Sequence, residues 1–162
     1  MSVAMSRLAL VLVVAATAAN VSAEATGTQA DAQAVQLLVM KMALGKAERS
    51  RKVQVVYVSL GKQGNDPPTE VLAALADGTH LFKPASACPR ESRGILGEFC
   101  RPEDGAVELF AGEVSFVKDD LADVSAGYSF DLLKAAGCPY RLRRAGDAWS
   151  LVADYVGACW VS

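Results

Sequence analysis

The sequence predicts an α+β domain in which an N-terminal helix packs on a curved antiparallel sheet stapled by disulfides. Between residues 31 and 47, apolar residues repeat with the period of about 3.6 residues that is typical of a helix lying on a core. Between residues 121 and 131, apolar and polar residues alternate as in a strand with one buried face. The four cysteines, an even number in a chain that begins with an export signal, indicate two disulfides.

Residues 1–23 have the pattern of a secretory signal peptide. Arg7 supplies the positive charge ahead of the apolar run LALVLVVAATAA, and Val21-Ser22-Ala23 fits the small-x-small cleavage pattern. The apolar run is shorter than the roughly 20 residues that a membrane-spanning helix needs. We therefore expect cleavage after Ala23, a periplasmic or secreted mature protein, and no membrane span after cleavage.

Length and charge narrow the classes of partner. After the signal we expect a flexible tail at residues 24–30 and a single domain at residues 31–162, since a chain of this length suits one domain. The formal net charge is −2 at pH 7. A mildly acidic chain has no electrostatic reason to bind nucleic acid or an anionic membrane surface, so we expect neither as a partner. The oligomeric state stays open.

The first helix is predicted from Asp31 to Ala47, with Asp31 as its N-cap. Lys41 and Lys46 suit its C-terminal half, where the helix dipole favours cations. One face carries apolar residues at positions i, i+3, i+4 and i+7, namely Val35, Leu38, Val39 and Met42. We expect this face to lie on the sheet.

A buried strand and a second, shorter helix follow. Val53–Leu60 is rich in β-branched residues and predicts the strand. Asp66 is positioned to cap the second helix, Pro67 suits its first turn because no backbone donor is needed there, and Gly78 ends it. A short strand over residues 79–83 comes next.

The segment Ala85–Gly105 has no sustained period and is too long for an ordinary connection, so it is functional, stapled by its cysteines, or both. Three cysteine pairings are possible. We favour Cys88 with Cys100, which closes this segment, and Cys138 with Cys159, which joins the flanks of a C-terminal hairpin. The alternative of a metal site is disfavoured because the chain has no CxxC motif and a single histidine.

The rest of the chain predicts an antiparallel meander. Its strands are Val107–Val117, Leu121–Asp131, Tyr140–Ala145 and Ala148–Val156. The first strand is bulged at residues 111–112, where the alternation shifts phase. Gly146 and Asp147 form a two-residue hairpin turn between the last two strands.

The sequence contains no recognisable nucleophile or acid–base pair. His80 is the only imidazole, and it lies on a short apolar strand without a GxSxG nucleophile elbow. Asp119 and Asp120 belong to a predicted turn. Asp123 and Asp131 share a strand face but are too far apart along it to act together. We expect no catalytic residue, no cofactor and no metal.

Two arginines are the candidate binding residues. Arg141 and Arg143 project from one face of a predicted strand, beside Arg144. Their guanidinium groups match carboxylates and phosphates, so they could form an anion- or partner-binding patch. The alternative is a solvated sheet face on which they are balanced by nearby carboxylates, those of Asp123, Asp131 and Asp154.

Three segments carry a resemblance to a group of proteins: NDPPTEVLAAL, PASAC, and YRLRRAGDAWSLV with the closing WVS. They resemble a loosely defined group of small exported bacterial proteins of uncharacterised function. The resemblance implies a compact α+β domain of the cystatin-like or nuclear-transport-factor-like kind, with a helix against a curved antiparallel sheet. It implies no active-site residue, and such folds host many functions.

We therefore expect a non-enzymatic periplasmic binding or interaction module whose partner is another protein. The long stapled segment and the arginine-bearing face favour this function, as does the lack of a catalytic motif. The alternative is a small enzyme or ligand carrier with a pocket between helix and sheet. Aromatic residues would line that pocket or simply fill the core: Tyr57, Phe116, Tyr128, Tyr140 and Trp149. A deep cavity with a buried titratable group would favour the alternative.

Overall fold

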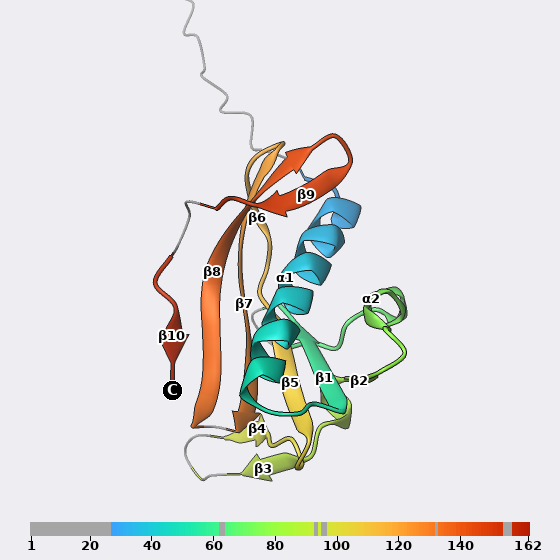
Figure 1. Ribbon diagram of the computed structural model, residues 1–162, viewed down its shortest axis with the longest axis vertical. Helices are drawn as coiled ribbons and strands as arrows, with labels where there is room; N and C mark the ends of the chain where they lie inside the picture. Colours follow the sequence, from blue (N-terminus) through green and yellow to red (C-terminus); the bar gives the residue numbers. More distant parts are fainter. Residues whose placement is uncertain (1–26, 62–63, 93, 95–96, 132, 154–156) are drawn as a thin grey trace, which may run out of the picture.

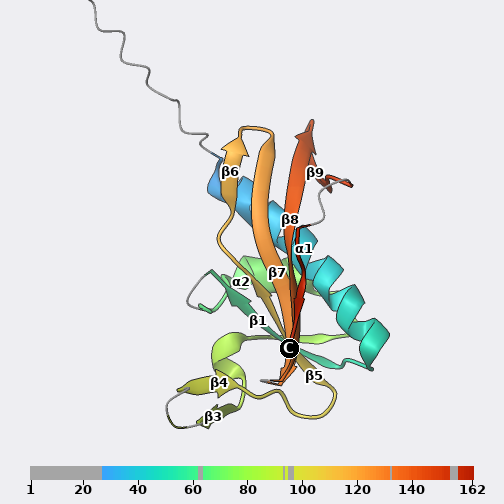
Figure 2. The ribbon, with the colours of Figure 1, turned by 90° about the vertical axis from the view of Figure 1, so that its left-hand side faces the viewer.

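The computed structural model describes residues 27–61, 64–92, 94, 97–131, 133–153 and 157–162. The predicted signal peptide lies outside the described residues. One long helix, α1 (Gln29–Ser50), lies across one face of a curved, half-barrel sheet, as Figures 1 and 2 show from two directions. In the part of the chain that is described, no helix is long and apolar enough to cross a membrane.

Two helical segments and ten strands follow or surround α1 in the chain as described. They are β1 (Val55–Leu60), α2 (Thr69–Leu75), β2 (Leu81–Pro84), the 3-10 turn η1 (Ala85–Ala87), β3 (Arg90–Ser92), β4 (Glu98–Cys100), β5 (Ala106–Ala111), β6 (Ser115–Lys118), β7 (Leu121–Asp131), β8 (Lys134–Ala145), β9 (Ala148–Leu151) and β10 (Trp160–Val161). The main sheet has the order β10-β8-β7-β5-β1-β2, with β6 also pairing with β7 and β9 with β8.

The sheet is mixed, so the prediction of an antiparallel sheet is wrong for its β1 side. β1 pairs in parallel with both β2 and β5, whereas the pairs among β5 to β10 are antiparallel. The physical reason is the length of the connections. The connection that contains α2 carries the chain back from the end of β1 to the start of β2. The segment between β2 and β5 carries it back again to the start of β5, as parallel pairing requires.

α1 begins with a capping box, and Asp31 is not its N-cap as predicted. The N-cap is Thr28, whose hydroxyl accepts a hydrogen bond from the Asp31 backbone N–H at 3.1 Å. The Asp31 carboxylate accepts in return from the Thr28 backbone N–H at 3.3 Å. The helix therefore starts at Gln29, and residues 29 and 30 belong to it rather than to a tail.

The buried face of α1 is rotated from the predicted one. Val35 and Val39 are fully buried as expected, whereas Leu38 and Met42 are only partly buried. The other buried residues of the helix are Met40, Ala43, Leu44 and Ala47. Small alanine side chains on this stripe allow the helix backbone to approach the strands closely.

The core lies between α1 and alternate residues of the sheet. In β7, Ala122, Val124, Ala126 and Phe130 are buried, which confirms the predicted alternation of Leu121–Asp131. Val56 and Val58 of β1 and Leu109 of β5 join the same core. Burial of apolar side chains on one face of a pleated sheet follows directly from the two-residue period.

The second helix starts without the predicted cap. α2 begins at Thr69, and Pro68 occupies its N-cap position with no side-chain hydrogen bond. The Asp66 carboxylate accepts instead from the Ser86 backbone N–H, at 2.7 Å. Asp66 therefore fastens the turn after β2 to the start of α2, so its prediction as a cap is wrong. Gly78, with φ of +77°, lies in the turn beyond the helix as predicted.

Both predicted disulfide pairings are confirmed, Cys88–Cys100 and Cys138–Cys159. The first staples η1 to the small β3–β4 hairpin, so the segment before β5 is more ordered than an irregular loop. Cys88, Cys100, Tyr57 and Ala106 form a separate buried cluster. Tyr57 alternates with the core residues of β1, so this cluster lies on the sheet face away from α1.

The C-terminal hairpin forms in the predicted register. Arg143 pairs with Ser150 and Ala145 with Ala148 across the Gly146 turn, where φ is +62°. The strand predicted at Val107–Val117 is instead two strands, β5 and β6, and the break follows the predicted bulge. Gly112 donates its N–H to the Ser125 carbonyl at the break, at 2.7 Å. Residues 154–156 of the predicted last strand lie outside the described residues.

Candidate functional site

His80 holds two segments together. Its Nδ1 lies 2.6 Å from Asp77 Oδ2, and its Nε2 lies 3.1 Å from Glu48 Oε1 on α1. The hydrogen bond from His80, with others from backbone N–H groups, lowers the pKa of the Asp77 carboxyl. Each ring nitrogen of His80 thus lies within hydrogen-bond distance of a carboxylate. We infer a structural role for His80, which joins α1 to the turn before β2.

The arginines of the predicted patch do not act together, because Arg141 and Arg144 bind different carboxylates. The Arg141 guanidinium forms a fork with the Asp123 carboxylate, with distances of 2.7 and 2.6 Å. Arg144 points to the α1 side, where it meets Asp31 at 2.7 Å. Arg143 is exposed on the same face as Arg141. Arg141 therefore has the carboxylate neighbour that the balanced-face alternative requires, and binding at Arg141 and Arg143 stays a prediction.

The five aromatic residues of the predicted pocket do not gather in one place. Tyr57 lies on the opposite sheet face, where its hydroxyl donates to Glu103 at 2.9 Å. Phe116 and Trp149 pack together, with ring centroids 6.0 Å apart. Tyr128 and Tyr140 remain, and both line a cavity beside the C-terminal half of α1. Only two of the five predicted residues therefore line one cavity, and the pocket that the sequence analysis offered as an alternative stays a prediction.

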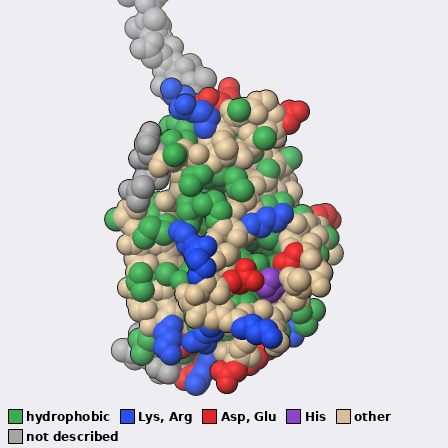
Figure 3. All heavy atoms as spheres, viewed as in Figure 1, with side chains coloured by type: hydrophobic (Ala, Val, Ile, Leu, Met, Phe, Trp, Pro, Cys, Tyr) green, Lys and Arg blue, Asp and Glu red, His purple; other side chains and the backbone are tan. Residues whose placement is uncertain are grey.

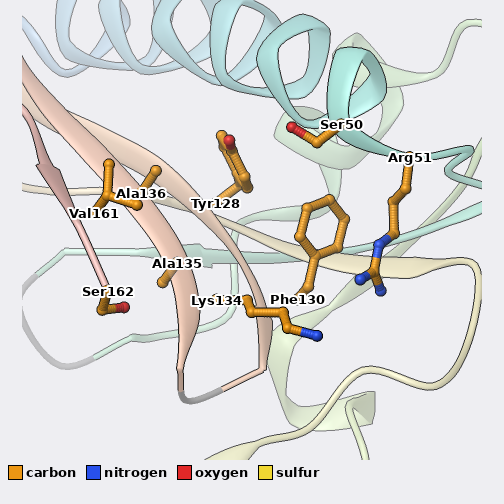
Figure 4. A pocket seen from close by; sticks show the side chains of 9 residues that line it. All are labelled: Ser50, Arg51, Tyr128, Phe130, Lys134, Ala135, Ala136, Val161 and Ser162. Carbon is orange, nitrogen blue, oxygen red and sulfur yellow. The ribbon is translucent and has the colours of Figure 1, made fainter.

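Two adjoining cavities of about 260 and 140 Å³ lie between α1 and strands β7, β8 and β10. They share Tyr128, Ala136 and Val161, and we call them together the helix–sheet groove. Figure 4 shows the larger cavity, with Ser50 and Arg51 above it and the side chains of β7 and β8 below. The groove is close to the lower end of the range of small-ligand sites, roughly 300–1,000 Å³.

The floor of the groove is aromatic. Tyr128 and Phe130 project from β7 with ring centroids 5.5 Å apart, in an edge-to-face arrangement. The Arg51 guanidinium lies 4.3 Å from the centroid of the Phe130 ring. Such a contact between a cation and an aromatic face holds both side chains in place without neutralising the charge.

The inner end of the groove is walled by a disulfide. Cys138 and Cys159 both line the smaller cavity, and their bond holds β10 beside β8. Lys46 of α1 donates to the Tyr140 hydroxyl at 2.9 Å and lies 3.5 Å from the Cys138 sulfur. Trp160, on β10, also borders this cavity and is 47% exposed.

The described residues that line the two cavities of the groove include no histidine, aspartate, glutamate or free cysteine. Titratable groups with raised pKa values lie elsewhere. Burial and the Glu103 carboxylate raise the pKa of Tyr57 to about 12, and burial raises the pKa of Glu108. Both belong to strands β1 and β5 and lie outside the groove lining. Within the described part of the chain, no cluster of three or more metal-ligating side chains occurs.

Sequence reasoning missed most residues of the groove. The sequence analysis relates Lys46 only to the helix dipole and gives no role to Arg51 or Lys134. The signal that could have found them is the placement of cations at the C-terminal end of a helix that faces a strand with aromatic residues. Figure 3 shows several Lys and Arg side chains gathered around that end of the molecule.

Comparisons with protein-family models, with curated proteins and with solved structures gave no match. The resemblance to small exported bacterial proteins therefore stays a prediction. The chain's function is inferred from the groove itself.

Proposed function

We propose that the protein is an exported, non-enzymatic binding module that holds a small, mainly apolar ligand in the helix–sheet groove. The observation that carries this proposal is the groove itself, a concave space with an aromatic floor formed by Tyr128 and Phe130 and an inner wall formed by the Cys138–Cys159 disulfide. Ligand sites are typically concave and apolar, with few polar groups.

The lining favours binding over catalysis. The described residues of the groove provide aromatic rings, small side chains, hydroxyls and cations, but no carboxylate or imidazole side chain that could act as a general base near neutral pH. This is the composition of a carrier or sensor. It corresponds to the ligand-carrier alternative of the sequence analysis.

Export is part of the proposal. Two disulfides are compatible with a secreted protein, because disulfides persist in oxidising compartments such as the bacterial periplasm. The signal-like sequence at residues 1–23 supports the same location.

A neutral apolar dye, N-phenyl-1-naphthylamine, tests the proposal. We expect saturable binding to one site, seen as enhanced dye fluorescence. Ala136 faces both cavities, so Ala136→Trp should fill the groove and abolish binding. Ala145→Trp is the matched control, since Ala145 is an exposed alanine on the same strand. Equal dye binding by the two variants, or no saturable binding by the wild type, would refute the proposal.

Thermal unfolding of each variant shows whether the added ring disturbs the fold. If Ala136→Trp is poorly folded, Ala136→Leu provides a smaller obstruction at the same position. It should weaken the dye without abolishing binding, and unchanged affinity in a folded Ala136→Leu protein would count against the groove.

A second candidate function is protein recognition through the sheet face away from α1. The exposed Arg143 side chain favours it, because none of the described carboxylates pairs with it. Arg141, on the same face, is already engaged by Asp123, so Arg143 would carry the recognition.

A further inference from the structure

We infer that the ligand of the helix–sheet groove is an amphiphilic anion, with its apolar chain in the two cavities and its negative group beside Arg51 and Lys134. The inference rests on the proposed function and adds to it the chemical class of the ligand and its orientation. It is carried by the charges at the mouth of the groove and by the change in polarity along it.

The mouth of the groove carries two exposed cations, Arg51 and Lys134. Arg51 is exposed, lies against the Phe130 ring, and is paired with none of the described carboxylates. Lys134 has a side chain that is 63% exposed, and its Nζ reaches only to 3.9 Å from an Asp131 carboxylate oxygen. Figure 4 shows both cationic side chains on the same side of the larger cavity, flanking Phe130. Two cations with one distant acid favour an anionic group there.

The cavity walls are mainly apolar on one side of Arg51 and Lys134 and largely charged on the other. A third cavity of about 410 Å³ shares Arg51, Phe130 and Lys134 with the groove and lies toward the stapled β3–β4 segment. Its other walls are largely charged, with Glu91, Arg101 and Asp104 among them. Arg51 and Lys134 therefore stand at the boundary between an apolar space and a charged, hydrated one.

Two of the side-chain carboxylates near this boundary have cationic partners. Glu91 pairs with Arg101, and Asp131 is the acid that approaches Lys134. Asp104 lines the third cavity but not the groove. None of these side-chain carboxylates forms an ion pair with the Arg51 guanidinium.

The orientation of the ligand follows from this arrangement. A chain end placed beside Ala136, Val161 and the Cys138–Cys159 disulfide leaves water, while an anion at the boundary keeps part of its hydration and gains two cations. The reverse orientation would place the anion in the inner cavity. Among the described residues that line the inner cavity, Lys46 is the only cation, and it already donates a hydrogen bond to the Tyr140 hydroxyl.

Three probes of equal chain length test the inference: decanoate, decanol and decylamine, each displacing N-phenyl-1-naphthylamine from the wild-type protein. We expect decanoate to bind most tightly and decylamine most weakly. Arg51→Gln should weaken decanoate about threefold to fivefold, the range of a partly exposed ion pair, and leave decanol unchanged. Raising the ionic strength should weaken decanoate alone, because salt screens exposed charges.

Arg49→Gln is the matched control. Arg49 lies in the last turn of the same helix, is exposed, and does not line the groove. The Arg49→Gln substitution removes one positive charge from the same helix end as Arg51→Gln. A loss of decanoate affinity in Arg51→Gln alone therefore reports contact with the ligand, and not a general effect of charge or of the helix dipole. Decanoate affinity should be unchanged in Arg49→Gln.

The outcomes separate the two proposals. Saturable dye binding with equal displacement by all three probes would overturn the anionic class and leave the proposed function standing. Equal weakening of decanoate by Arg49→Gln and Arg51→Gln would overturn the placement of the anion. A free amphiphile and a membrane headgroup share this chemistry, and we infer the free molecule. Co-sedimentation with phosphatidylglycerol vesicles that is lost in Arg51→Gln would overturn that choice.

Discussion

Alanine substitutions at two glycines should change stability in opposite directions. Gly127 of β7 faces Gly137 of β8 in the sheet register. A Cβ atom at position 127 would lie 2.5 Å from the Phe110 ring and 2.7 Å from the Gly137 Cα, and closer still to the Ala136 carbonyl oxygen. Two of these neighbours are backbone atoms, so a change of rotamer cannot relieve the overlap and the strands must move apart.

The expected size of the effect follows from this geometry. Overpacking costs about 1–3 kcal/mol, and Gly127→Ala should be near 3 kcal/mol because backbone must shift. Gly45 is the matched control: it is inside α1, and an added Cβ would meet no atom within 4 Å. Gly45→Ala should therefore stabilise the protein by about 1 kcal/mol through helix propensity alone.

Thermal unfolding followed by circular dichroism measures both changes. For a domain of this size, about 4 °C per kcal/mol implies a melting temperature about 12 °C lower for Gly127→Ala and about 4 °C higher for Gly45→Ala. A Gly127→Ala protein as stable as the wild type would show that β7 and β8 do not approach as closely as the structure has them. Loss of stability in Gly45→Ala would contradict the open space beside that helix position.

Three further predictions concern a disulfide, a pH dependence and the arginine face. Replacing Cys138 and Cys159 together by alanine should lower the free energy of unfolding by about 3 kcal/mol in denaturant titrations, from the chain entropy of the closed loop, and should weaken dye binding because β10 is no longer tied to β8. A hydrogen bond from the Thr28 hydroxyl, helped by Arg144, lowers the pKa of Asp31 to about 2. The stabilisation from this group is therefore complete above the unfolded pKa of about 3.9 and is lost as the pH falls toward 2, so the difference in melting temperature between wild type and Asp31→Asn should shrink over that range. The double change of Arg141 and Arg143 to Glu should lower the melting temperature by breaking the fork with the neighbouring carboxylate; unchanged stability together with lost capture of a partner protein would show instead that this face is an interaction surface.

Local patterns predicted the local structure well. The strand Leu121–Asp131 has the bounds that its alternation predicts, and the hairpin turn at Gly146 has the predicted register. In both cases the deciding interaction is between residues close in sequence or between one strand face and the core. Both disulfide pairings are also confirmed, since each joins cysteines that flank a compact segment.

Capping and strand direction were predicted less well. Asp31 and Asp66 both have the residue type of an N-cap, yet Asp31 is the third residue of the helix, where it completes the capping box of Thr28, and Asp66 binds the backbone of Ser86. The parallel pairing of β1 depends on where the chain comes back to form β2 and β5, its two neighbours in the sheet. One local signal was present, because β1 is buried on both faces, as strands of parallel sheets commonly are.

The sequence by itself determined the long helix at residues 29–50, the strand Leu121–Asp131 and the hairpin turn at Gly146, because these depend on the period of apolar residues and on turn chemistry. The even number of cysteines likewise indicated two disulfides. Only the tertiary structure decided where a ligand could bind. Arg51, Phe130 and Cys159 are far apart in the chain, and they line one groove because α1 crosses the sheet at a particular place and the Cys138–Cys159 disulfide brings β10 beside β8. The position of a helix on a sheet is set by the fit of many side chains at once, which no short stretch of sequence contains.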